Sequence, residues 1–330
     1  MKPITKMRYL PFLLLLFIFN GYANETLLKQ ASQLESEGKY KEAMELYKQV
    51  AIENTTQKKP SDDTITQKQI KFLKASLDPI EDKTTNSTIA QILSSSFNIY
   101  AYNDNYFLPL SHDMKAKADR KQNESKFQIS IKKPISYDFF GLNETINFGY
   151  TQTSWWQTYA DSMPFRESNY RPEIFMVIPT KLLDNTPFKA YKIGLLHESN
   201  GQGELKSRSW NRIYAEGYLQ LHNLFIIPKI WYRLPEEEKN DDNPDIEDYL
   251  GYGDLSFFYA YKEHTFKLLL RDNMKFDANN KGYAELNWTF PLPNSKNTFG
   301  FVQLSSGYGD SLIDYDKEIN RISFGISLSR

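Results

Sequence analysis

Residues 191–219 read YKIGLLHESNGQGELKSRSWNRIYAEGYL, and they indicate the fold class because apolar and polar residues alternate on both sides of a polar loop. With the loop centred near Glu204, Asn211 stands opposite His197 at the roughly 5 Å spacing of a cross-strand pair. The stretch therefore predicts a β-hairpin that gathers a serine, a histidine and an asparagine on an apolar surface. The residues on that surface are Tyr191, Ile193, Leu195, His197 and Ser199 on the first arm, and Asn211, Ile213, Ala215 and Leu219 on the second.

The same alternation returns in short runs beyond Ser96. About twelve runs occur, an even number, as a closed antiparallel barrel with both termini on one side requires. Closure pairs every backbone group, so we predict an all-β fold, a closed antiparallel β-barrel of about 12 strands with a small α-helical N-terminal extension. The export signal and the family resemblance described below favour a transmembrane antiparallel β-barrel. The apolar face of these strands would meet lipid and the charged face would line the interior. A soluble barrel would reverse the two faces, and the alternation alone does not choose between them.

The composition excludes several classes of protein. A net charge of −1 over 330 residues argues against a nucleic-acid partner, which usually requires a basic excess. The absence of cysteine excludes disulfides, cysteine-based metal sites and a lipoprotein anchor. Aromatic residues make up 15% of the chain, which suits the girdles of a membrane barrel and also an aromatic-rich soluble β-sandwich. The mean hydropathy of −0.58 agrees with barrel strands, whose alternation keeps the average low.

Four segments are expected along the chain. Residues 1–23 have the basic start, apolar run and small residues of a secretory signal peptide. Residues 24–53 carry apolar residues at three- and four-residue steps and predict a periplasmic helical hairpin that resembles one tetratricopeptide-like repeat, either of unknown role or binding a partner. Residues 54–95 are expected to be a polar linker and lead-in with one short helix near 66–76, and residues 96–330 the barrel.

The hairpin carries the residue types of a nucleophilic catalyst. A serine hydroxyl needs a base to take its proton, and His197 lies two residues from Ser199 on the same face. The amide oxygen of Asn211 can accept from the other ring nitrogen and fix the tautomer. Because an amide cannot neutralise the imidazolium, we expect a divalent cation near the developing oxyanion to supply charge stabilisation. A His-x-Ser pair without the asparagine would be incidental.

Other polar residues are open to two interpretations. Gln152 lies on the apolar face of a predicted strand, where a lone amide facing lipid is costly; a symmetric partner amide would satisfy it, as would hydration near the headgroups. Asp242 in the run 240–243 is either a ligand or part of a solvated acidic turn. The remaining histidines lack comparable neighbours and are expected in loops or at strand ends, so no histidine metal cluster is predicted; they are His112, His222 and His264.

Two motifs in the hairpin are specific: His197-Glu198-Ser199-Asn200-Gly201 and Ser207-Arg208-Ser209-Trp210-Asn211-Arg212. Together they resemble the active-site hairpin of the bacterial outer membrane phospholipase A family. The resemblance covers roughly residues 96–328. Further segments similar to that family, in the same order, are Tyr150-Thr151-Gln152, Ser154-Trp155-Trp156-Gln157, Pro164-Phe165-Arg166-Glu167, Asp241-Asp242-Asn243-Pro244-Asp245-Ile246 and Ser306-Gly307-Tyr308-Gly309-Asp310-Ser311-Leu312-Ile313-Asp314-Tyr315.

The resemblance implies a calcium-dependent serine hydrolase of the cell outer membrane, with its N-terminal extension in the periplasm. The implied activity is that of a phospholipase A1/A2 that cleaves acyl esters of glycerophospholipids and also accepts lysophospholipids. The implied state is a homodimer, and oxygen-only ligation suits Ca²⁺. The implied residues are Ser199 as nucleophile, His197 as base and Asn211 as orienting group; Ser207, the backbone carbonyl of Gln202, Asp242 and, from a second copy, Ser162 as calcium ligands; and Gln152 at the dimer interface.

Two alternatives to this activity remain open. One is a non-catalytic porin-like barrel whose charged inner face conducts solutes. The other is a lipid A deacylase-type barrel hydrolase with a similar Ser-His pair, which differs in its substrate. The chain ends in Ser327-Leu328-Ser329-Arg330 where family members end in an aromatic residue. We therefore expect either an assembly signal further in, at Phe324, or a different insertion efficiency.

Overall fold

The computed structural model describes parts of the span 29–46, residues 78 and 80–93, and residues 99–329 except 116, 181–185, 238 and 240. The predicted signal peptide, residues 1–23, and the short helix predicted near 66–76 lie outside the described residues. Within the predicted helical hairpin, residues 32–34 and 42–46 are helical. None of the helices in the described ranges has the length and apolar character needed to cross a membrane. The chain divides into two compact units, residues 1–61 and 62–330, and the second contains a barrel.

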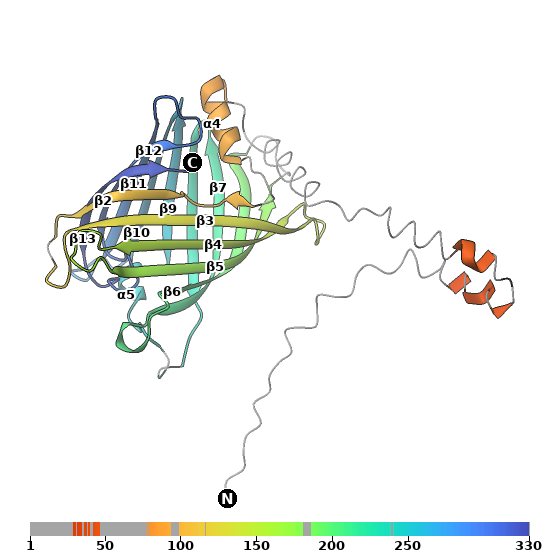
Figure 1. The fold of residues 1–330 in the computed structure, drawn as a ribbon, viewed down its shortest axis with the longest axis horizontal. Coiled ribbons are helices and arrows are strands. Elements are labelled where there is room, and N and C mark those ends of the chain that lie inside the picture. The colour runs from red at the N-terminus through yellow and green to blue at the C-terminus, as the bar shows by residue number, and fades with distance from the viewer. Residues whose placement is uncertain are drawn as a thin grey trace, which may run out of the picture. The chain divides into compact units, whose positions relative to one another are not determined.

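One antiparallel sheet forms the barrel wall (Figure 1). Its strands are β1 (Tyr100–Ala101), β2 (Tyr106–Asp113), β3 (Asn123–Tyr137), β4 (Thr145–Trp156), β5 (Phe165–Pro179), β6 (Phe188–Ser199), β7 (Ser209–Leu221), β8 (Leu224–Arg233), β9 (Gly253–Tyr261), β10 (His264–Asp272), β11 (Gly282–Pro291), β12 (Phe299–Gly307) and β13 (Ile319–Ser327). Three short helical elements accompany it in the described part of the barrel unit: α4 (Lys83–Leu93), the 3₁₀ turn η1 (Glu204–Lys206) and α5 (Glu247–Leu250).

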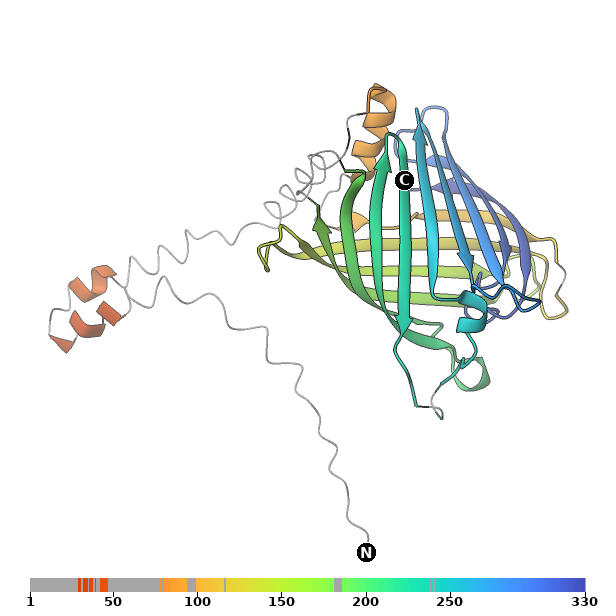
Figure 2. The ribbon, with the colours of Figure 1, turned by 180° about the vertical axis from the view of Figure 1, so that it is seen from behind.

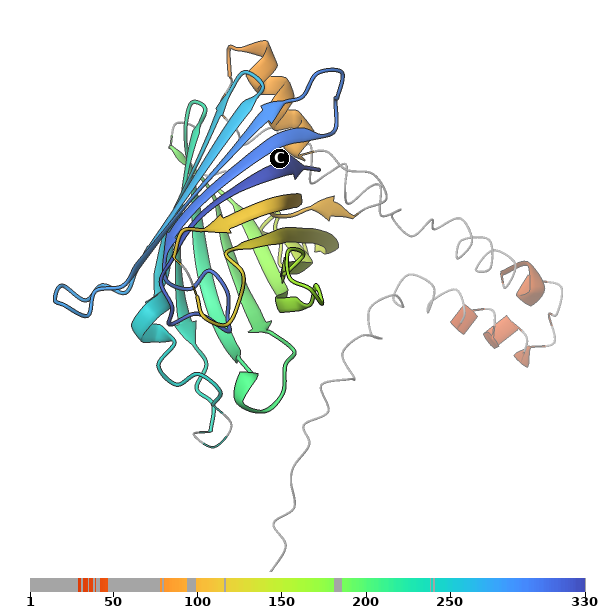
Figure 3. The ribbon, with the colours of Figure 1, turned by 60° about the vertical axis from the view of Figure 1, so that its left-hand side comes forward.

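The sheet closes on itself, as the slanted strands in Figure 3 show. From β2 onward each strand pairs with the next along the chain, and β13 pairs with β2. Both β1 and β2 pair with β3, so they form one interrupted strand. Asn105 lies in the interruption, and its side chain accepts from Ser130 N (2.6 Å) and donates to Ser130 O (2.9 Å), as a backbone partner would. The barrel therefore has twelve strand positions, which confirms the predicted number.

The two ends of the barrel differ in their connections (Figure 2). One end has the connections 138–144, 180–187, 222–223, 262–263 and 292–298. Two of them are two-residue turns, in which His222 and Lys262 adopt φ values of 56° and 53°. The other, the long-loop end, carries η1 and α5 and is formed by the loops 114–122, 157–164, 200–208, 234–252, 273–281 and 308–318. In outer membrane barrels the short turns face the periplasm and the long loops face the exterior. The family resemblance therefore implies that the long-loop end faces the exterior.

Helix α4 was not predicted, since residues 83–93 fell within the expected polar linker. Its sequence, KTTNSTIAQIL, is rich in residues of low helix propensity. Asp82 Oδ1 accepts from Thr85 N at the start of the helix (2.6 Å). The β9–β10 turn then holds it, because Thr88 Oγ1 donates to Lys262 O (3.0 Å) and Lys262 N donates to Thr85 Oγ1 (2.8 Å). Contacts with the barrel stabilise a helix that local sequence preference does not favour.

The barrel has an apolar outer face and a polar inner face, as expected for a membrane barrel and not for a soluble one. On β6 the outward side chains of Ile193 and Leu195 are 44% and 50% exposed, whereas the inward Lys192 is 2% exposed. On β8 the outward Ile230 is 67% exposed. Such apolar exposure around a wall with a charged interior is the pattern of a barrel in lipid and the reverse of a soluble one.

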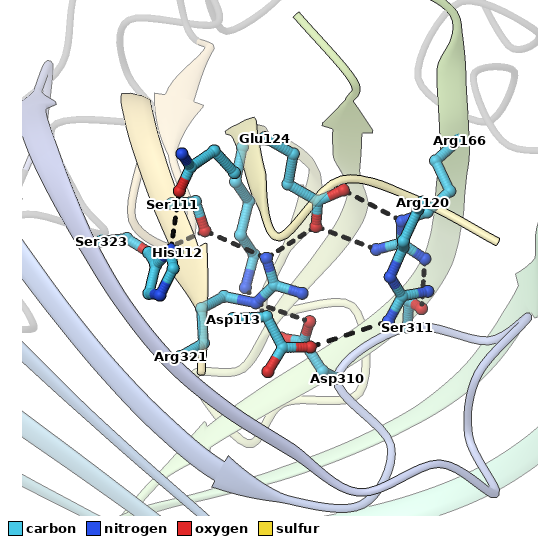
Figure 4. Close-up of polar contacts among 12 residues, drawn as sticks. Ser111, His112, Asp113, Arg120, Glu124, Arg166, Asp310, Ser311, Arg321 and Ser323 are labelled. Carbon is cyan, nitrogen blue, oxygen red and sulfur yellow. Dashed lines mark hydrogen bonds and ion pairs between the residues drawn. The ribbon is translucent and has the colours of Figure 1, made fainter. Parts of the chain in front are cut away.

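Ion pairs fill the interior near the long-loop end (Figure 4). Arg321 on β13 pairs with Glu124 on β3 (2.6 Å) and with Asp310 of the β12–β13 loop (3.4 Å). Glu124 also pairs with Arg166 (3.0 Å), and Asp310 with Lys126 (3.1 Å). All five side chains are at most 10% exposed. The β12–β13 loop is therefore anchored inside the barrel by charge pairing.

Candidate active site

The β6–β7 hairpin presents the predicted catalytic side chains on the outer wall. His197 pairs with Asn211, and Ser199 with Ser209, so the predicted register is confirmed. His197 Nδ1 lies 2.9 Å from Asn211 Oδ1. An amide oxygen only accepts, so Nδ1 carries the proton in this contact and Nε2 is the basic nitrogen.

Ser199 lies two residues beyond His197, at the end of β6 that leads into the 200–208 loop. Its side chain and that of His197 are half-buried on the same outward face. Within the described chain, no hydrogen bond joins the serine hydroxyl to the imidazole. Contacts between a nucleophile and its base are often long before substrate binds, and the shared face leaves both groups open to a ligand from the lipid side.

An open groove of about 380 Å³ runs along the outer wall beside the histidine. His197 and Asn211 form its polar part. The other outward-facing side chains that line it are apolar, namely Phe148, Pro172, Ile174, Leu195 and Leu234. Ligand sites combine an apolar lining with a few placed polar groups, and this groove fits an apolar chain that carries a polar group beside the imidazole.

Asn200 organises the loop between β6 and β7, and sequence reasoning missed this role. Its Oδ1 accepts from Gln202 N (3.2 Å) and Arg208 N (3.0 Å), and its Nδ2 donates to Lys206 O (2.8 Å). Gly201 follows with a φ of 63°, a conformation that glycine adopts without strain. The Asn-Gly pair is a turn signal in its own right and could have indicated the role.

Two of the four predicted calcium ligands meet, and a third lies in the same loop. Ser207 Oγ donates to Asp242 Oδ2 at 2.5 Å, which joins the β6–β7 loop to the β8–β9 loop. Gln202 is part of the β6–β7 loop, and its Nε2 donates to Glu167 (2.7 Å). In the described ranges no three His, Cys, Asp or Glu side chains gather as a metal site, so a cation here depends on hydroxyl and carbonyl oxygens as well. Such oxygens suit Ca²⁺, which takes about six to eight of them, more than this loop supplies.

Ser162 and Gln152 lie outside this loop. Ser162 is exposed in the β4–β5 loop, and among the described residues no hydrogen bond connects it with the β6–β7 or β8–β9 loop. Gln152 faces outward on β4, but contrary to expectation it is not a lone amide. Tyr150 Oη donates to its Oε1 (3.0 Å), and its Nε2 donates to Ser154 Oγ (3.1 Å). One N–H and one lone pair of the amide remain for another partner.

Glu167, at the start of β5, connects two loops of the site. Its buried carboxylate accepts from Gln202 Nε2 (2.7 Å) and from Ile313 N in the β12–β13 loop (3.1 Å). Asn169 Nδ2 donates to it as well (2.5 Å). Asn200 Nδ2 is a fourth donor (3.5 Å), so removing this carboxylate would leave four donors without this acceptor. Glu167 therefore fixes the loop of the predicted calcium ligands to the loop that is anchored in the barrel.

Neighbouring residues also set the protonation states of Asp314 and Tyr315 in the β12–β13 loop. Asp314 accepts from Arg166 (2.6 Å) and from Arg120. Burial by itself would raise the pKa of Asp314, but the two guanidinium groups outweigh burial and lower the pKa. Burial, together with the hydrogen bond that its hydroxyl donates to Asp245, raises the pKa of Tyr315. At neutral pH the aspartate is charged and the tyrosine neutral.

Glu236 is a further polar neighbour of the catalytic side chains that sequence reasoning missed. Asn211 Nδ2 donates to Glu236 Oε1 at 3.1 Å. The glutamate belongs to the β8–β9 loop, in the acidic run Glu236-Glu237-Glu238. Nothing in that run distinguishes one carboxylate from the next, so the contact emerges only from the folded loop.

The other three histidines lie at strand ends or in a turn, as predicted. His112 is next to the last residue of β2 and contacts Asn123 Oδ1 (2.7 Å). His222 occupies the β7–β8 turn. His264 begins β10 and accepts from Trp288 Nε1 (3.2 Å). None of them neighbours the pair formed by His197 and Asn211.

Several proteins of known sequence are similar to this chain. A family model described as Phospholipase A1 matches residues 82–328. The phospholipase A1 of Klebsiella pneumoniae is 35% identical over 260 residues, covering 74% of this chain and 87% of the relative. A protein of Neisseria meningitidis that carries the same family name is 40% identical over 217 residues, 63% of this chain, and the match spans 55% of that relative's length.

Solved structures of outer membrane phospholipases also superpose on this chain. The outer membrane phospholipase of Salmonella typhi, crystallised as a dimer with bound calcium, superposes with a TM-score of 0.65 at 31% identity, covering 74% of this chain and 98% of that one. Outer membrane phospholipase A of Escherichia coli gives a TM-score of 0.64 at 30% identity, covering 71% and 99%. An E. coli variant with an active-site asparagine replaced by alanine gives 0.65 at 30% identity, covering 74% and 98%. The chain belongs to the phospholipase A1 family and is an outer membrane β-barrel hydrolase of carboxylic esters.

Proposed function

We propose that this protein cleaves acyl esters of glycerophospholipids in the outer leaflet, as a calcium-dependent phospholipase A1/A2 that also accepts lysophospholipids. The observation that carries the proposal is the 2.9 Å contact between His197 Nδ1 and Asn211 Oδ1 on the lipid-facing wall. This contact borders an apolar groove that opens toward the bilayer. A water-soluble substrate would gain nothing from that position, whereas a phospholipid acyl chain reaches it directly.

Each of the three side chains has one role. Asn211 accepts from Nδ1–H and keeps Nε2 of His197 unprotonated. That nitrogen takes the proton of Ser199 as the hydroxyl oxygen attacks the ester carbonyl. The imidazolium then returns the proton to the departing alcohol, which leaves as a lysophospholipid. Water activated by the same imidazole releases the fatty acid and restores the serine. The asparagine replaced in the E. coli active-site variant supports giving this role to Asn211.

The residues that would hold a calcium ion are Ser207, Asp242 and the backbone carbonyl of Gln202, with Ser162 of the partner subunit. When bound, the ion supplies the positive charge that an asparagine cannot, beside the oxygen that becomes negative. The calcium-bound dimer of the S. typhi relative supports both the ion and the second subunit. The exposure of Ser162 in its own chain supports a ligand donated across an interface.

We place Gln152 at the centre of that interface, where its spare N–H and lone pair meet the same amide of the partner. Dimerisation would then control the activity, because a monomer surrounded by lipopolysaccharide lacks a complete calcium site and stays inactive. The chain has no cysteine, so Gln152→Cys introduces a sole thiol that oxidation cross-links across the two-fold axis. The cross-linked dimer should hydrolyse faster than the reduced protein, and a dimer no more active than monomer refutes this control.

A porin-like function is disfavoured by the ion pairs that bridge the long-loop end of the lumen. The deciding experiment measures fatty acid release from phosphatidylcholine by the detergent-solubilised protein, with calcium and with a chelator. Wild type should release fatty acid only with calcium, and Ser199→Ala should release none. Equal release by both proteins would sink the proposal. Release from lipopolysaccharide instead of phosphatidylcholine would favour a lipid A deacylase.

A further inference from the structure

The hydrogen-bond chain of the active site does not stop at Asn211. Beyond the contact with His197, the amide nitrogen of Asn211 donates to Glu236 Oε1 at 3.1 Å. We propose that Glu236 is a positioning residue for the hydrolysis reaction, which orients Asn211 and brings a carboxylate charge within one side chain of the imidazole. This inference rests on the proposed function, because it concerns the efficiency of the same serine.

The first effect of Glu236 is geometric. The two ends of an asparagine amide have nearly the same shape, but one end only accepts and the other only donates. A carboxylate only accepts, so Glu236 can bind the nitrogen end and not the oxygen end. With that end occupied, Asn211 Oδ1 must face His197 and Nδ1 must carry the proton. The carboxylate thereby selects the imidazole tautomer that leaves Nε2 free to act as a base.

The second effect is electrostatic. In the Ser-His-Asp arrangement a carboxylate holds the imidazole and stabilises its charged form directly. Here the neutral Asn211 contacts the imidazole, and Glu236 accepts a hydrogen bond from the other end of the same amide. A hydrogen bond to a charged group is stronger than one between neutral groups, and a charged acceptor polarises the donor that it binds. The imidazolium of His197 thus regains part of the stabilisation that an amide alone does not supply.

The backbone holds Glu236 in this position. Beyond the end of β8, Leu234 N donates to Asn211 O at 2.8 Å, so the chain follows β7 past the active-site asparagine. Pro235 then limits the backbone before the glutamate. Glu236 is half-buried, whereas its neighbour Glu237 has a side chain that is 70% exposed and pairs with Lys239 (2.9 Å). Two adjacent carboxylates of equal charge therefore differ in whether they touch the active site.

This difference supplies a matched control. We would compare Glu236→Ala, Glu236→Gln and Glu237→Gln by steady-state hydrolysis of a dispersed phosphatidylcholine with saturating calcium. Glu236→Ala should lower kcat roughly tenfold with little change in KM, the size of one hydrogen bond to a charged group. Glu236→Gln keeps an acceptor but no charge and should fall between Glu236→Ala and wild type. Glu237→Gln should match wild type. Circular dichroism melting of each variant checks that the barrel is intact.

The double variant tests whether Glu236 acts through the asparagine. In an Asn211→Ala background, Glu236→Ala should cause no further loss of kcat. An equal loss in both backgrounds would mean that the glutamate acts by another route, and the inference would be overturned. It would also be overturned if Glu236→Ala and Glu237→Gln had the same kcat.

A readout independent of activity separates this inference from the proposed function. In ¹⁵N-labelled protein, ring-nitrogen NMR signals assigned with His197→Ala should report the Nδ1–H tautomer in wild type and in Glu237→Gln. Glu236→Ala should shift the signal toward the other tautomer. If wild type fails to hydrolyse phospholipid but the tautomer still depends on Glu236, the proposed substrate is wrong and the positioning role stands. If the enzyme is active and Glu236→Ala leaves the His197 tautomer unchanged, the positioning role is rejected and the proposed function is kept.

Discussion

His197 and Glu198 are neighbours on β6, yet they face different surroundings. His197 points to the outer wall, where it contacts Asn211 beside an apolar groove. Glu198 points inward, where it accepts from Trp210 Nε1 (3.1 Å) and from Arg212. The inner wall is dense with charge pairs (Figure 4), whereas the polar part of the outer groove consists of His197 and Asn211. The comparison teaches that strand alternation separates the groups that perform chemistry from those that stabilise the barrel, so the two should fail separately.

The largest expected effect is on the outer wall. His197→Ala removes the base, so we expect kcat to fall by roughly 10⁴-fold or more, as in serine hydrolases that lose a catalytic residue. The melting temperature should not change, because His197 belongs to no buried charge network. His264→Gln, on the outer wall of β10, is the control and should retain full kcat. Comparable hydrolysis by His197→Ala and wild type would contradict the assignment.

The inner wall should respond in the opposite way. Arg321→Met removes one of the two cationic partners that Glu124 and Asp310 each have inside the barrel, and breaking one side of such a network costs up to about 3–5 kcal/mol. Denaturant unfolding from detergent micelles should show that loss, while the protein that remains folded keeps wild-type kcat. Lys275→Met removes an exposed lysine that pairs with Asp248 at the surface and should cause no measurable change. Equal stability of all three proteins would show that the lumen network is dispensable.

Replacement of Asn211 tests whether this outer-wall side chain orients the imidazole. Asn211→Ala should lower kcat by roughly 10- to 100-fold, since one or two hydrogen bonds to the imidazole chain are lost. Asn211→Asp, combined with Glu236→Gln so that two carboxylates do not face each other, restores an acceptor for Nδ1–H and should retain more activity than the alanine variant. Initial rates with saturating calcium distinguish the three proteins. If the aspartate variant is as slow as the alanine variant, orientation of the imidazole is not what Asn211 provides.

The predicted calcium ligands should give a concentration effect. Asp242→Asn removes the only carboxylate among them, so we expect the calcium concentration for half-maximal activity to rise roughly tenfold. Activity should return when calcium is raised, because the catalytic side chains are untouched. Asp277→Asn, in the exposed β10–β11 loop, serves as a control with the same change of charge. A calcium titration that is identical for both variants would remove Asp242 from the site.

The smallest expected effect is the pH dependence of stability that arises from aspartates inside the barrel. The pKa values of Asp310 and Asp314 are lowered, because neighbouring cations outweigh burial. An aspartate with a lowered pKa contributes stability above its unfolded pKa of about 3.9, and this contribution is lost as the pH falls through the folded value. The contribution of these two aspartates to the melting temperature should therefore stay constant from pH 8 to 5 and decline only below about pH 4. Asp314→Asn should weaken that acid-side decline; an unchanged decline would assign it to other carboxylates.

Much of this molecule could be predicted from sequence, because a period of two is a local property. The alternation in residues 191–219 indicated the strands, the separation of their side chains into an apolar and a polar face, and the pairing of His197 with Asn211. The motif that contains them also indicated the family, which the match over residues 82–328 confirmed. Each of these features depends on neighbours within one hairpin, so no distant contact was needed to infer it.

Only the tertiary structure decided the rest. The polar sequence of α4 becomes helical because the β9–β10 turn binds it, and β1 separates from β2 because Asn105 reaches across to Ser130. The contact of Asn211 with Glu236 joins residues 25 positions apart through a loop whose acidic run gave no local signal. Partners that are distant in the chain leave no periodicity in it. The sequence alone therefore determined the strands of the closed barrel and the residues of the catalytic hairpin. The helix α4, the break between β1 and β2 and the contact of Asn211 with Glu236 were decided by the fold.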